Sequence, residues 1–328
     1  MSGVNSKRTV VGVDLGGTKI LTGIVDGENR ILGRAKRDTP AKEGGAAILS
    51  AIVGSIDDAL AAAGLDRDAV GAVGIGSPGP LDPVTGVIAF SANMNVRNFA
   101  LGPDLSAALG GKPVLLQNDV RVGGYGEYRL GAGRGYRNLL AAFVGTGIGG
   151  CVIVDGRIVQ GSTGNAGELG HMIVRAGGPK CGCGNRGCME SLASRTAIAR
   201  RIAKAAKRGM PSVLLGKVEK KSGRLKSKDL AAAFLERDPV TLREVHRAAH
   251  YLGLGLGSLV NVLGPEIVII GGGVTSALGA PWIELIRTSA RRQILVDPLG
   301  SIKIEASSLG DDSGLLGASL LAREQFGI

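Results

Sequence analysis

The chain has 328 residues, 44% of them hydrophobic and 20% charged, which predicts a globular protein of about two domains with a sizeable core. Its 55 glycines show no collagen-like period. The composition as a whole therefore excludes a fibre and a disordered chain, and the glycines predict many tight turns. The formal net charge is +11, but only 3% of the residues are aromatic, which argues against a stacking platform for single-stranded nucleic acid.

The first predicted elements form a β-hairpin. An apolar strand at 10–15 leads into the turn Gly16-Gly17-Thr18, and a second strand follows at 19–25. A similar pattern recurs around Gly145, with an apolar strand on each side of the glycines. Two copies of one supersecondary unit predict two similar lobes with a ligand cleft between them.

The second glycine cluster, at 145–150, matches the pattern G-x-G-x-x-G of dinucleotide-binding proteins. That fingerprint requires a helix after the glycines, whereas residues 151–156 read as a β-branched strand and a turn. A turn between two strands can still hold phosphate through successive backbone N–H groups. We therefore expect a phosphate-binding turn and not a dinucleotide-binding fold.

Between and after the two hairpins, strands alternate with helices, which indicates an α/β protein. The patterns predict strands at 72–75, 113–117 and 266–270, and helices at 44–63, 190–208, 227–236, 239–263, 281–293 and 313–325. Ser313 is expected to cap the last of these helices. No uninterrupted apolar run reaches the ~20 residues of a membrane span, and the start MSGVNSKR lacks the apolar stretch of a signal peptide, so we expect a cytoplasmic protein that contacts no membrane.

Two carboxylates stand at predicted strand ends. Asp14 lies where the first strand meets its glycine turn, and it suits a place beside a phosphate-bound Mg²⁺, although a turn-capping role remains open. Asp119 follows the strand at 113–117 and suits a general base, which has to reach the proton that it removes. An ordinary Asn-Asp turn at 118–119 is the alternative.

The densest group of reactive side chains runs from Gly167 to Glu190. One imidazole, His171, and the three thiols of Cys181, Cys183 and Cys188 make a Cys₃His set suited to tetrahedral Zn²⁺. Four protein ligands close the coordination shell, so the predicted zinc is structural and does not activate water.

The excess positive charge lies in the segment 195–228, which holds twelve lysines and arginines against the single acid Glu219. A solvated helix and loop would account for this segment. A basic rim that attracts a polyanionic substrate or a nucleotide is the alternative.

In this order, these motifs resemble the ROK family (repressors, open reading frames, kinases) of the sugar-kinase/actin superfamily, and its bacterial glucokinases in particular. The zinc signature is the most specific part: Gly170-His171, then Cys181-x-Cys183-Gly-x-x-Gly187-Cys188-x-Glu190. The resemblance implies a two-lobed, ribonuclease H-like α/β fold with a small lobe at 1–118 plus 312–328 and a larger lobe at 119–311.

The resemblance also implies ATP, Mg²⁺ and structural Zn²⁺ as cofactors and a hexose, most of all glucose, as the substrate phosphorylated on its 6-hydroxyl. Asp119 is then the catalytic base. The sugar ligands would be Gly79, Asn93, Asn118, Asp119, Glu168, His171 and Glu190, and the nucleotide ligands Asp14, Gly16, Gly17, Thr18, Lys19, Gly145, Thr146, Gly147, Gly271, Gly272 and Gly273. His171 would bind zinc through one ring nitrogen and a sugar hydroxyl through the other.

The chain departs from the family pattern at three places. Many relatives carry a tryptophan shortly after the position of Asn93, but residues 94–99 of this chain include no tryptophan. The wall at the sugar entry therefore differs from that of those relatives. Cys151 stands where the second phosphate motif usually ends in a third glycine, and Val120-Arg121-Val122 replaces small residues. None of these changes removes a predicted catalytic group.

Other functions share this family. A kinase for an N-acetylhexosamine or for fructose, or a glucokinase that uses polyphosphate, would keep the fold and change a substrate. The family also includes sugar-sensing transcriptional regulators, which carry an N-terminal helix-turn-helix module. Only nine residues precede Val10, so no specific nucleic-acid partner is expected. The family usually forms homodimers or homotetramers.

Overall fold

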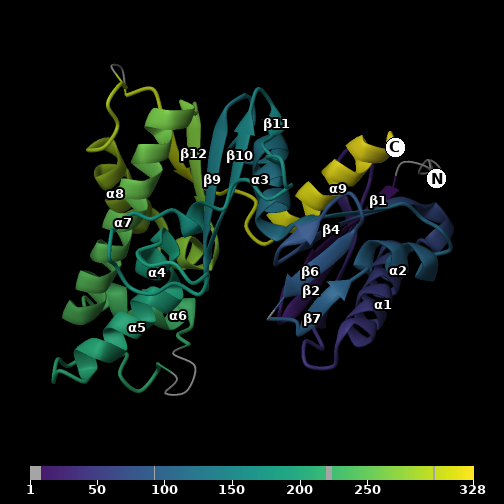
Figure 1. Ribbon diagram of the computed structural model, residues 1–328. Helices are drawn as coiled ribbons and strands as arrows, with labels where there is room; N and C mark the ends of the chain where they lie inside the picture. Colours follow the sequence, from purple (N-terminus) through teal and green to yellow (C-terminus); the bar gives the residue numbers. More distant parts are fainter. Residues whose placement is uncertain (1–8, 92, 219–223, 298–299) are drawn as a thin grey trace. The chain divides into compact units, whose positions relative to one another are not determined.

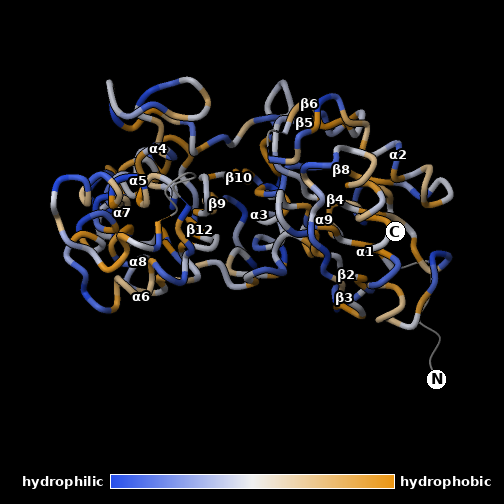
Figure 2. The backbone as a smooth tube through the Cα atoms, turned by 90° about the horizontal axis from the view of Figure 1, so that it is seen from below, coloured by the Kyte–Doolittle hydropathy of each residue, from blue (hydrophilic) through white to orange (hydrophobic). Residues whose placement is uncertain are grey.

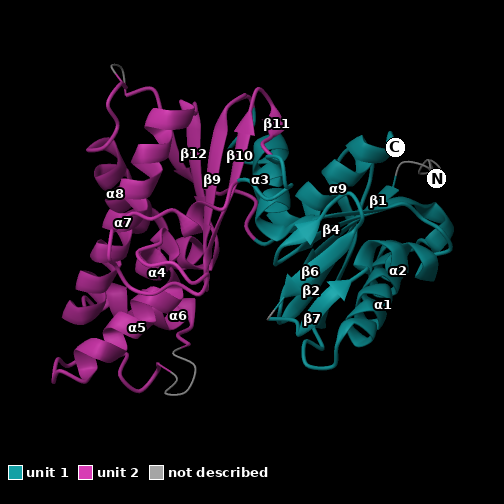
Figure 3. Cartoon of the chain, viewed as in Figure 1, with its two compact units in different colours: residues 1–134, 160–166, 311–328 teal, residues 135–159, 167–310 magenta. Residues whose placement is uncertain are grey.

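The structure, a computed structural model, describes residues 9–91, 93–218, 224–297 and 300–328 (Figure 1). The chain forms two compact units (Figure 3). Unit 1 comprises residues 1–134, 160–166 and 311–328, and unit 2 comprises residues 135–159 and 167–310. Each unit has a five-stranded sheet of its own, so the predicted two-lobed α/β fold is confirmed.

The sheet of unit 1 has the strand order β3-β2-β1-β4-β8. The first three strands are antiparallel and form the predicted hairpin with one added strand, whereas β1, β4 and β8 run parallel. Its strands are β1 (Thr9–Leu15), β2 (Lys19–Val25), β3 (Ile31–Asp38), β4 (Val70–Ser77) and β8 (Val114–Asn118).

The sheet of unit 2 has the order β11-β10-β9-β12-β13 and repeats this arrangement strand for strand. Again three strands are antiparallel. The innermost of them pairs in parallel with the next strand in the order, which pairs in parallel with the last. Its strands are β9 (Leu139–Val144), β10 (Ile148–Val154), β11 (Arg157–Ile158), β12 (Ile267–Gly271) and β13 (Lys303–Ala306). The internal repeat inferred from the two glycine clusters is therefore confirmed.

Unit 1 also contains helices α1 (Gly45–Ala63), α2 (Leu101–Ala108), α3 (Asp119–Leu130) and α9 (Asp312–Phe326), and a small sheet of β5 (Leu81–Asp82), β6 (Val87–Ser91) and β7 (Val96–Phe99). Among the described helices, α1 alone is long and apolar enough to cross a membrane by length and composition. It packs on β2 and β3 and buries Ile48, Ile52 and Ile56 in the core, and Figure 2 shows its apolar positions in orange.

The helices of unit 2 are α4 (Met189–Ala193), α5 (Arg195–Ala206), α6 (Ser227–Leu235), α7 (Pro239–Leu263) and α8 (Gly273–Arg291). The predicted single helix at 190–208 is wrong, because Ser194 adopts an extended conformation between α4 and α5 and its Oγ accepts the N–H of Ala197 as a cap. The predicted helix at 281–293 begins earlier, at Gly273, and it is kinked at Gly279, just before Pro281.

Helix α3 is absent from the sequence-based prediction. Its sequence holds Gly123, Gly124 and Gly126, which disfavour an isolated helix. The helix forms because it packs against α9 at very short range: a Cβ on Gly126 would lie 2.4 Å from the Ser313 oxygen, and a Cβ on Gly317 would lie 1.7 Å from the Val122 oxygen. The glycines that weaken the helix thus permit its contact with α9.

Because α3 packs on α9, it belongs to unit 1, whereas the predicted larger lobe begins at Asp119. Residues 160–166 also belong to unit 1, and the fully buried Arg121 explains why. Its guanidinium donates hydrogen bonds to the backbone oxygens of Gly164 and Ala166. Asp311 and not Ser313 occupies the N-cap position of α9, and the Asp311 side chain makes no capping hydrogen bond.

Candidate functional site

The predicted site residues of unit 1 gather at one edge of its sheet. Because β1, β4 and β8 are parallel, their carboxyl ends meet at the same edge, where open α/β sheets bind ligands. Asp14 on β1 pairs with Gly76 on β4, and Ser77 pairs with Asn118 on β8. Asp119 follows at once, in the first turn of α3. The two carboxylates singled out in the sequence therefore lie at the same sheet edge.

Asn118 fixes the position of Asp119. The Oδ1 atom of Asn118 accepts hydrogen bonds from the N–H groups of Val120 (3.1 Å) and Arg121 (3.2 Å), and so caps α3. The Asp119 Oδ1 accepts the N–H of Val120 at 2.9 Å. Asp119 thus lies in the first turn of α3, where the helix dipole favours a negatively charged group.

Asp14 is a strongly perturbed acid in unit 1. Burial, together with the negative charges of Asp119 and Asp311, raises the pKa of Asp14 to about 7. Helix α9 approaches the carboxyl closely, since a Cβ on Gly314 would lie 2.9 Å from the Asp14 Cγ atom. These carboxylates repel one another, and a cation bound between them would reduce that repulsion.

The first glycine turn lies beside a predicted sugar ligand. Gly16 donates its N–H to the Lys19 oxygen (2.8 Å) and closes the turn, which leaves Thr18 and Lys19 exposed. A Cβ on Gly17 would lie 3.1 Å from the Cβ of Asn93, so the phosphate motif and this amide are neighbours. Gly79 follows β4 with a φ of 105° close to the backbone of Phe90, where only glycine fits.

In unit 2, the two predicted nucleotide motifs meet around Arg195. The Arg195 Nη2 atom donates to the Thr146 Oγ1 (2.7 Å) in the turn between β9 and β10, and its Nη1 donates to the Ser227 Oγ (2.8 Å). A Cβ on Gly273 would lie 3.5 Å from the same Ser227 oxygen. Burial and the charge of Arg224 lower the pKa of Arg195.

The sequence motifs did not single out Arg195, although it contacts one of the predicted nucleotide turns. Its place within the basic segment 195–228 was the only signal, and that segment does not say which of its cations meets the glycine turns. The structure also shows why Gly272 is a glycine: it has a φ of 86°, and a Cβ there would lie 2.6 Å from the Val144 oxygen. The segment's Glu219, Lys220 and Lys221 lie outside the described residues.

Three predicted sugar ligands come from the segment that holds the cysteines. Glu168 is exposed, and its backbone oxygen accepts the N–H of His171 at 3.0 Å. Glu190, at the start of α4, accepts the N–H of Ile148 on its Oε2 (2.9 Å), which ties it to the turn between β9 and β10. Its other oxygen, Oε1, lies 3.7 Å from the Cys181 Sγ atom.

The predicted Cys₃His set comes together. One ligand atom from each of His171, Cys181, Cys183 and Cys188 lies within 4.8 Å of the others. The Sγ atoms of Cys183 and Cys188 are 3.7 Å apart, and the Cys181 Sγ is 3.7 Å from the His171 Nδ1. A tetrahedral zinc with Zn–S bonds of about 2.3 Å requires sulfur atoms about 3.8 Å apart, so the four side chains fit this ion.

The loop that carries the cysteines depends on two of the three glycines within it. Gly184 and Gly187 adopt positive φ angles of 99° and 82°. A Cβ on Gly187 would also lie 1.7 Å from the Arg175 oxygen, so no larger residue fits there. The His171 Nδ1 faces the cysteines, which leaves the Nε2 atom for another partner.

Comparisons with known proteins agree with these features. The ROK family model matches residues 10–325. The glucokinase of Thermotoga maritima is 35% identical over 98% of this chain and 99% of its own length. The crystal structure of a ROK hexokinase from Thermus thermophilus shares 37% identity and a TM-score of 0.81, covering 97% of this chain and 99% of that chain.

Two further matches bear on the ligands and on the alternatives. A ROK glucokinase from Streptomyces griseus, solved in complex with glucose and AMPPNP, shares 35% identity and a TM-score of 0.82 over 96% of this chain and 99% of that chain. The xylose repressor of Bacillus subtilis is 30% identical, but the match covers 77% of this chain and 61% of the repressor.

Proposed function

The chain belongs to the ROK family, and we propose on this basis that it is a hexose kinase that transfers the γ-phosphoryl group of ATP to the 6-hydroxyl of glucose. The observation that carries the proposal is its similarity to glucokinases over nearly the full length of both chains. The relatives that are repressors are less similar to this chain, at 26–30% identity against 33–35% for the glucokinases, which favours the kinase.

Asp119 is the catalytic base in this proposal. It accepts the proton of the 6-hydroxyl while that oxygen bonds to the γ-phosphorus, and the bond from phosphorus to the bridging oxygen breaks to release ADP. Mg²⁺ bound with ATP neutralises charge on the phosphates, and Asp14 is the side chain that would hold it, because its crowded carboxylate favours a cation.

The nucleotide ligands are the backbone N–H groups of the two glycine turns, together with Thr18 and Lys19. Thr146 belongs to the second turn, and Gly271, Gly272 and Gly273 would contact the adenosine. Arg195 joins this set, since it donates to Thr146 and lies beside Gly273. A guanidinium there would counter the charge of the transferring phosphoryl group.

The proposed sugar ligands are Gly79, Asn93, Asn118, Glu168, His171 and Glu190. Their carboxylates, amides and imidazole match the donors and acceptors of sugar hydroxyls. The Asn118 Oδ1 already caps α3, so its NH₂ group is the part that would donate to the sugar. Likewise, the Oε1 atom of Glu190 would accept from a hydroxyl, because Oε2 holds the N–H of Ile148.

An assay that measures the sugar phosphate formed from hexoses and N-acetylhexosamines, with ATP and polyphosphate as alternative donors, tests the function. We expect glucose and ATP to give the highest kcat/KM, and omission of Mg²⁺ to abolish turnover. A higher kcat/KM with an N-acetylhexosamine or fructose would show that this sugar, and not glucose, is the substrate. A higher kcat/KM with polyphosphate would show that polyphosphate, and not ATP, is the donor. Sequence-specific DNA binding with no turnover would instead indicate a regulator. A cytoplasmic location and a homodimer or homotetramer stay predictions.

The zinc proposal has a separate test. We expect the purified protein to contain one zinc ion per chain by elemental analysis, and Cys188→Ser to lose it because three ligands bind zinc far more weakly than four. The Nε2 atom of His171 would then lose its fixed direction, so the KM for glucose should rise.

Cys151→Ser is the matched control for the zinc test, since Cys151 is a buried cysteine in β10 outside the Cys₃His set. It should keep the full zinc content. Equal zinc content in the Cys188→Ser and Cys151→Ser proteins would contradict the assignment.

A further inference from the structure

Unit 2 contains a basic pocket that none of the proposed nucleotide or sugar ligands lines. The pocket has a volume of about 550 Å³, within the usual range for small-molecule sites. Seven of its lining side chains are cationic and one is acidic: Arg175, Arg200, Arg201, Lys204, Arg208, Arg243 and Arg247 against Glu244.

Most of the positive charge of the pocket comes from two helices that pack against each other. Arg200 and Lys204 lie one helical turn apart on α5, and the same spacing continues to Arg208. Arg243 and Arg247 have this spacing on α7, which packs against α5. Both helices therefore present basic side chains to one cavity.

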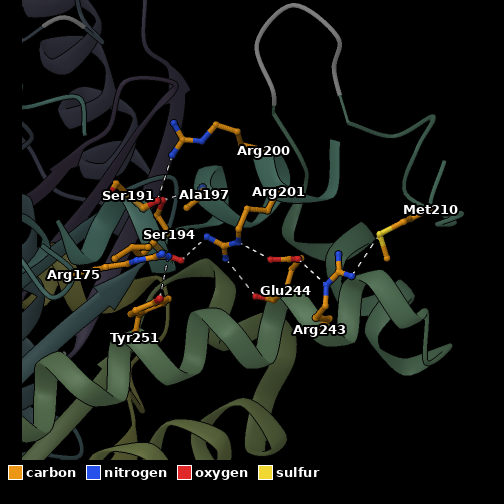
Figure 4. Close-up of polar contacts among 11 residues, drawn as sticks. Arg175, Ser191, Ser194, Ala197, Arg200, Arg201, Met210, Arg243, Glu244 and Tyr251 are labelled. Carbon is orange, nitrogen blue, oxygen red and sulfur yellow. Dashed lines mark hydrogen bonds and ion pairs between the residues drawn. The ribbon is translucent and has the colours of Figure 1, made fainter. Parts of the chain in front are cut away.

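The single carboxylate that lines the pocket, Glu244, is already hydrogen-bonded to two of its arginines. Glu244 is almost fully buried, and its Oε2 accepts from the Arg201 Nε (2.6 Å) while its Oε1 accepts from the Arg243 Nε (3.0 Å) (Figure 4). Arg201 also donates to the backbone oxygen of Leu192 at 2.7 Å. Both carboxylate oxygens of Glu244 therefore already accept hydrogen bonds from arginines of the pocket.

The remaining five cations have no carboxylate partner within the described part of the chain. Arg175 donates to the Tyr251 hydroxyl and Arg200 to the Ser191 oxygen, each at 3.3 Å (Figure 4). Lys204, Arg208 and Arg247 make no side-chain hydrogen bond to any described residue. Like charges held this close repel one another, and a bound anion removes that cost.

The pKa of Arg201 is affected by the other arginines of the pocket. Burial, and then the nearby charges of Arg247 and Arg200, lower the pKa of Arg201 against the effect of Glu244. Two neighbouring arginines of the pocket therefore act on the Arg201 guanidinium through their charge.

We propose that this pocket is a second ligand site of the protein, which binds a small anion bearing two or three phosphate groups. Guanidinium groups bind phosphate through paired hydrogen bonds, and four of the five unpaired cations are arginines. A phosphate group carries a charge of about −1.5 to −2 at neutral pH, so about three of them balance five cations. An inorganic phosphate chain and an organic bisphosphate share this chemistry.

The test measures binding to the full chain by isothermal titration calorimetry at an ionic strength of about 0.15 M, which suppresses non-specific attraction. Inorganic tripolyphosphate, a hexose bisphosphate and citrate are the probes. Tighter binding of tripolyphosphate indicates an inorganic chain as the natural ligand, and tighter binding of the bisphosphate indicates a phosphate ester. Citrate binding as tight as either phosphate probe would overturn the assignment to phosphate.

The double variant Arg208→Gln/Arg247→Gln removes two cations that hold no described contact, so the fold should persist. We expect it to weaken binding of the preferred phosphate probe at least tenfold, and the single variant Lys204→Gln to weaken it less. The control Arg157→Gln/Lys303→Gln removes the same charge from exposed positions on β11 and β13 of the same unit. Equal dissociation constants for the double variant, the control and the wild type would overturn the proposal, because binding elsewhere, including at the glycine turns, is the same in all three.

Discussion

Asp119→Asn should lower the kcat for glucose phosphorylation about 10²- to 10⁴-fold, the usual contribution of a general base. An amide cannot accept the proton of the attacking hydroxyl, but it has nearly the same shape as the carboxylate. The first turn of α3 and the Asn118 cap should therefore keep their geometry. The measurement is steady-state turnover, together with the dissociation constant for glucose from calorimetry.

The glucose dissociation constant of the Asp119→Asn protein should stay within about threefold of the wild-type value, since the substitution leaves the other sugar ligands in place. Asp104→Asn is the matched control, because Asp104 is an exposed acid in the first turn of α2. It should not change kcat. A folded Asp119→Asn protein with turnover within tenfold of the wild type would exclude Asp119 as the base.

Gly317→Ala should lower the free energy of unfolding by at least about 2 kcal/mol. A Cβ at this position would lie 1.7 Å from the Val122 oxygen and 2.8 Å from the Gly126 nitrogen, both of them backbone atoms of α3. Forcing the helices apart costs about 3 kcal/mol, which exceeds the gain of about 1 kcal/mol from the better helix propensity of alanine. Urea denaturation followed by circular dichroism measures the loss.

Gly216→Ala is the control for this prediction. Nothing lies within 4 Å of a Cβ built on Gly216, and its φ is not in the left-handed region. Its unfolding free energy should match the wild type within about 0.5 kcal/mol. Equal stability of Gly317→Ala and Gly216→Ala would show that α3 and α9 separate easily.

The hairpins at the start of the two sheets were predictable because their signals are local. Alternating apolar residues with a glycine turn specify a hairpin, and the recurrence around Gly145 specified a second copy. The Cys₃His set was predictable for the same reason, since its spacing lies within one short loop. Strand order follows from which elements pair across the chain, and no local pattern contains that information.

Helix α3 shows where local signals mislead. Gly123, Gly124 and Gly126 reduce the intrinsic helix propensity, and the contact with α9 that outweighs it lies almost 200 residues away in the chain. Arg195 and the basic pocket were hidden for a related reason. Composition located the positive charge at 195–228, but the roles of these side chains depend on which faces of α5 and α7 meet.

The discontinuity of unit 1 has a consequence for biosynthesis. Helix α9 packs against β1 and β4, where a Cβ on Gly12 or on Gly74 would lie 2.0 Å from a backbone oxygen of α9. The ribosome translates these strands long before α9, and it makes all of unit 2 in between. During synthesis, one face of the amino-terminal sheet therefore stays uncovered until α9 has been made. We expect unit 2 to complete its core before unit 1 does, although translation of unit 1 begins first.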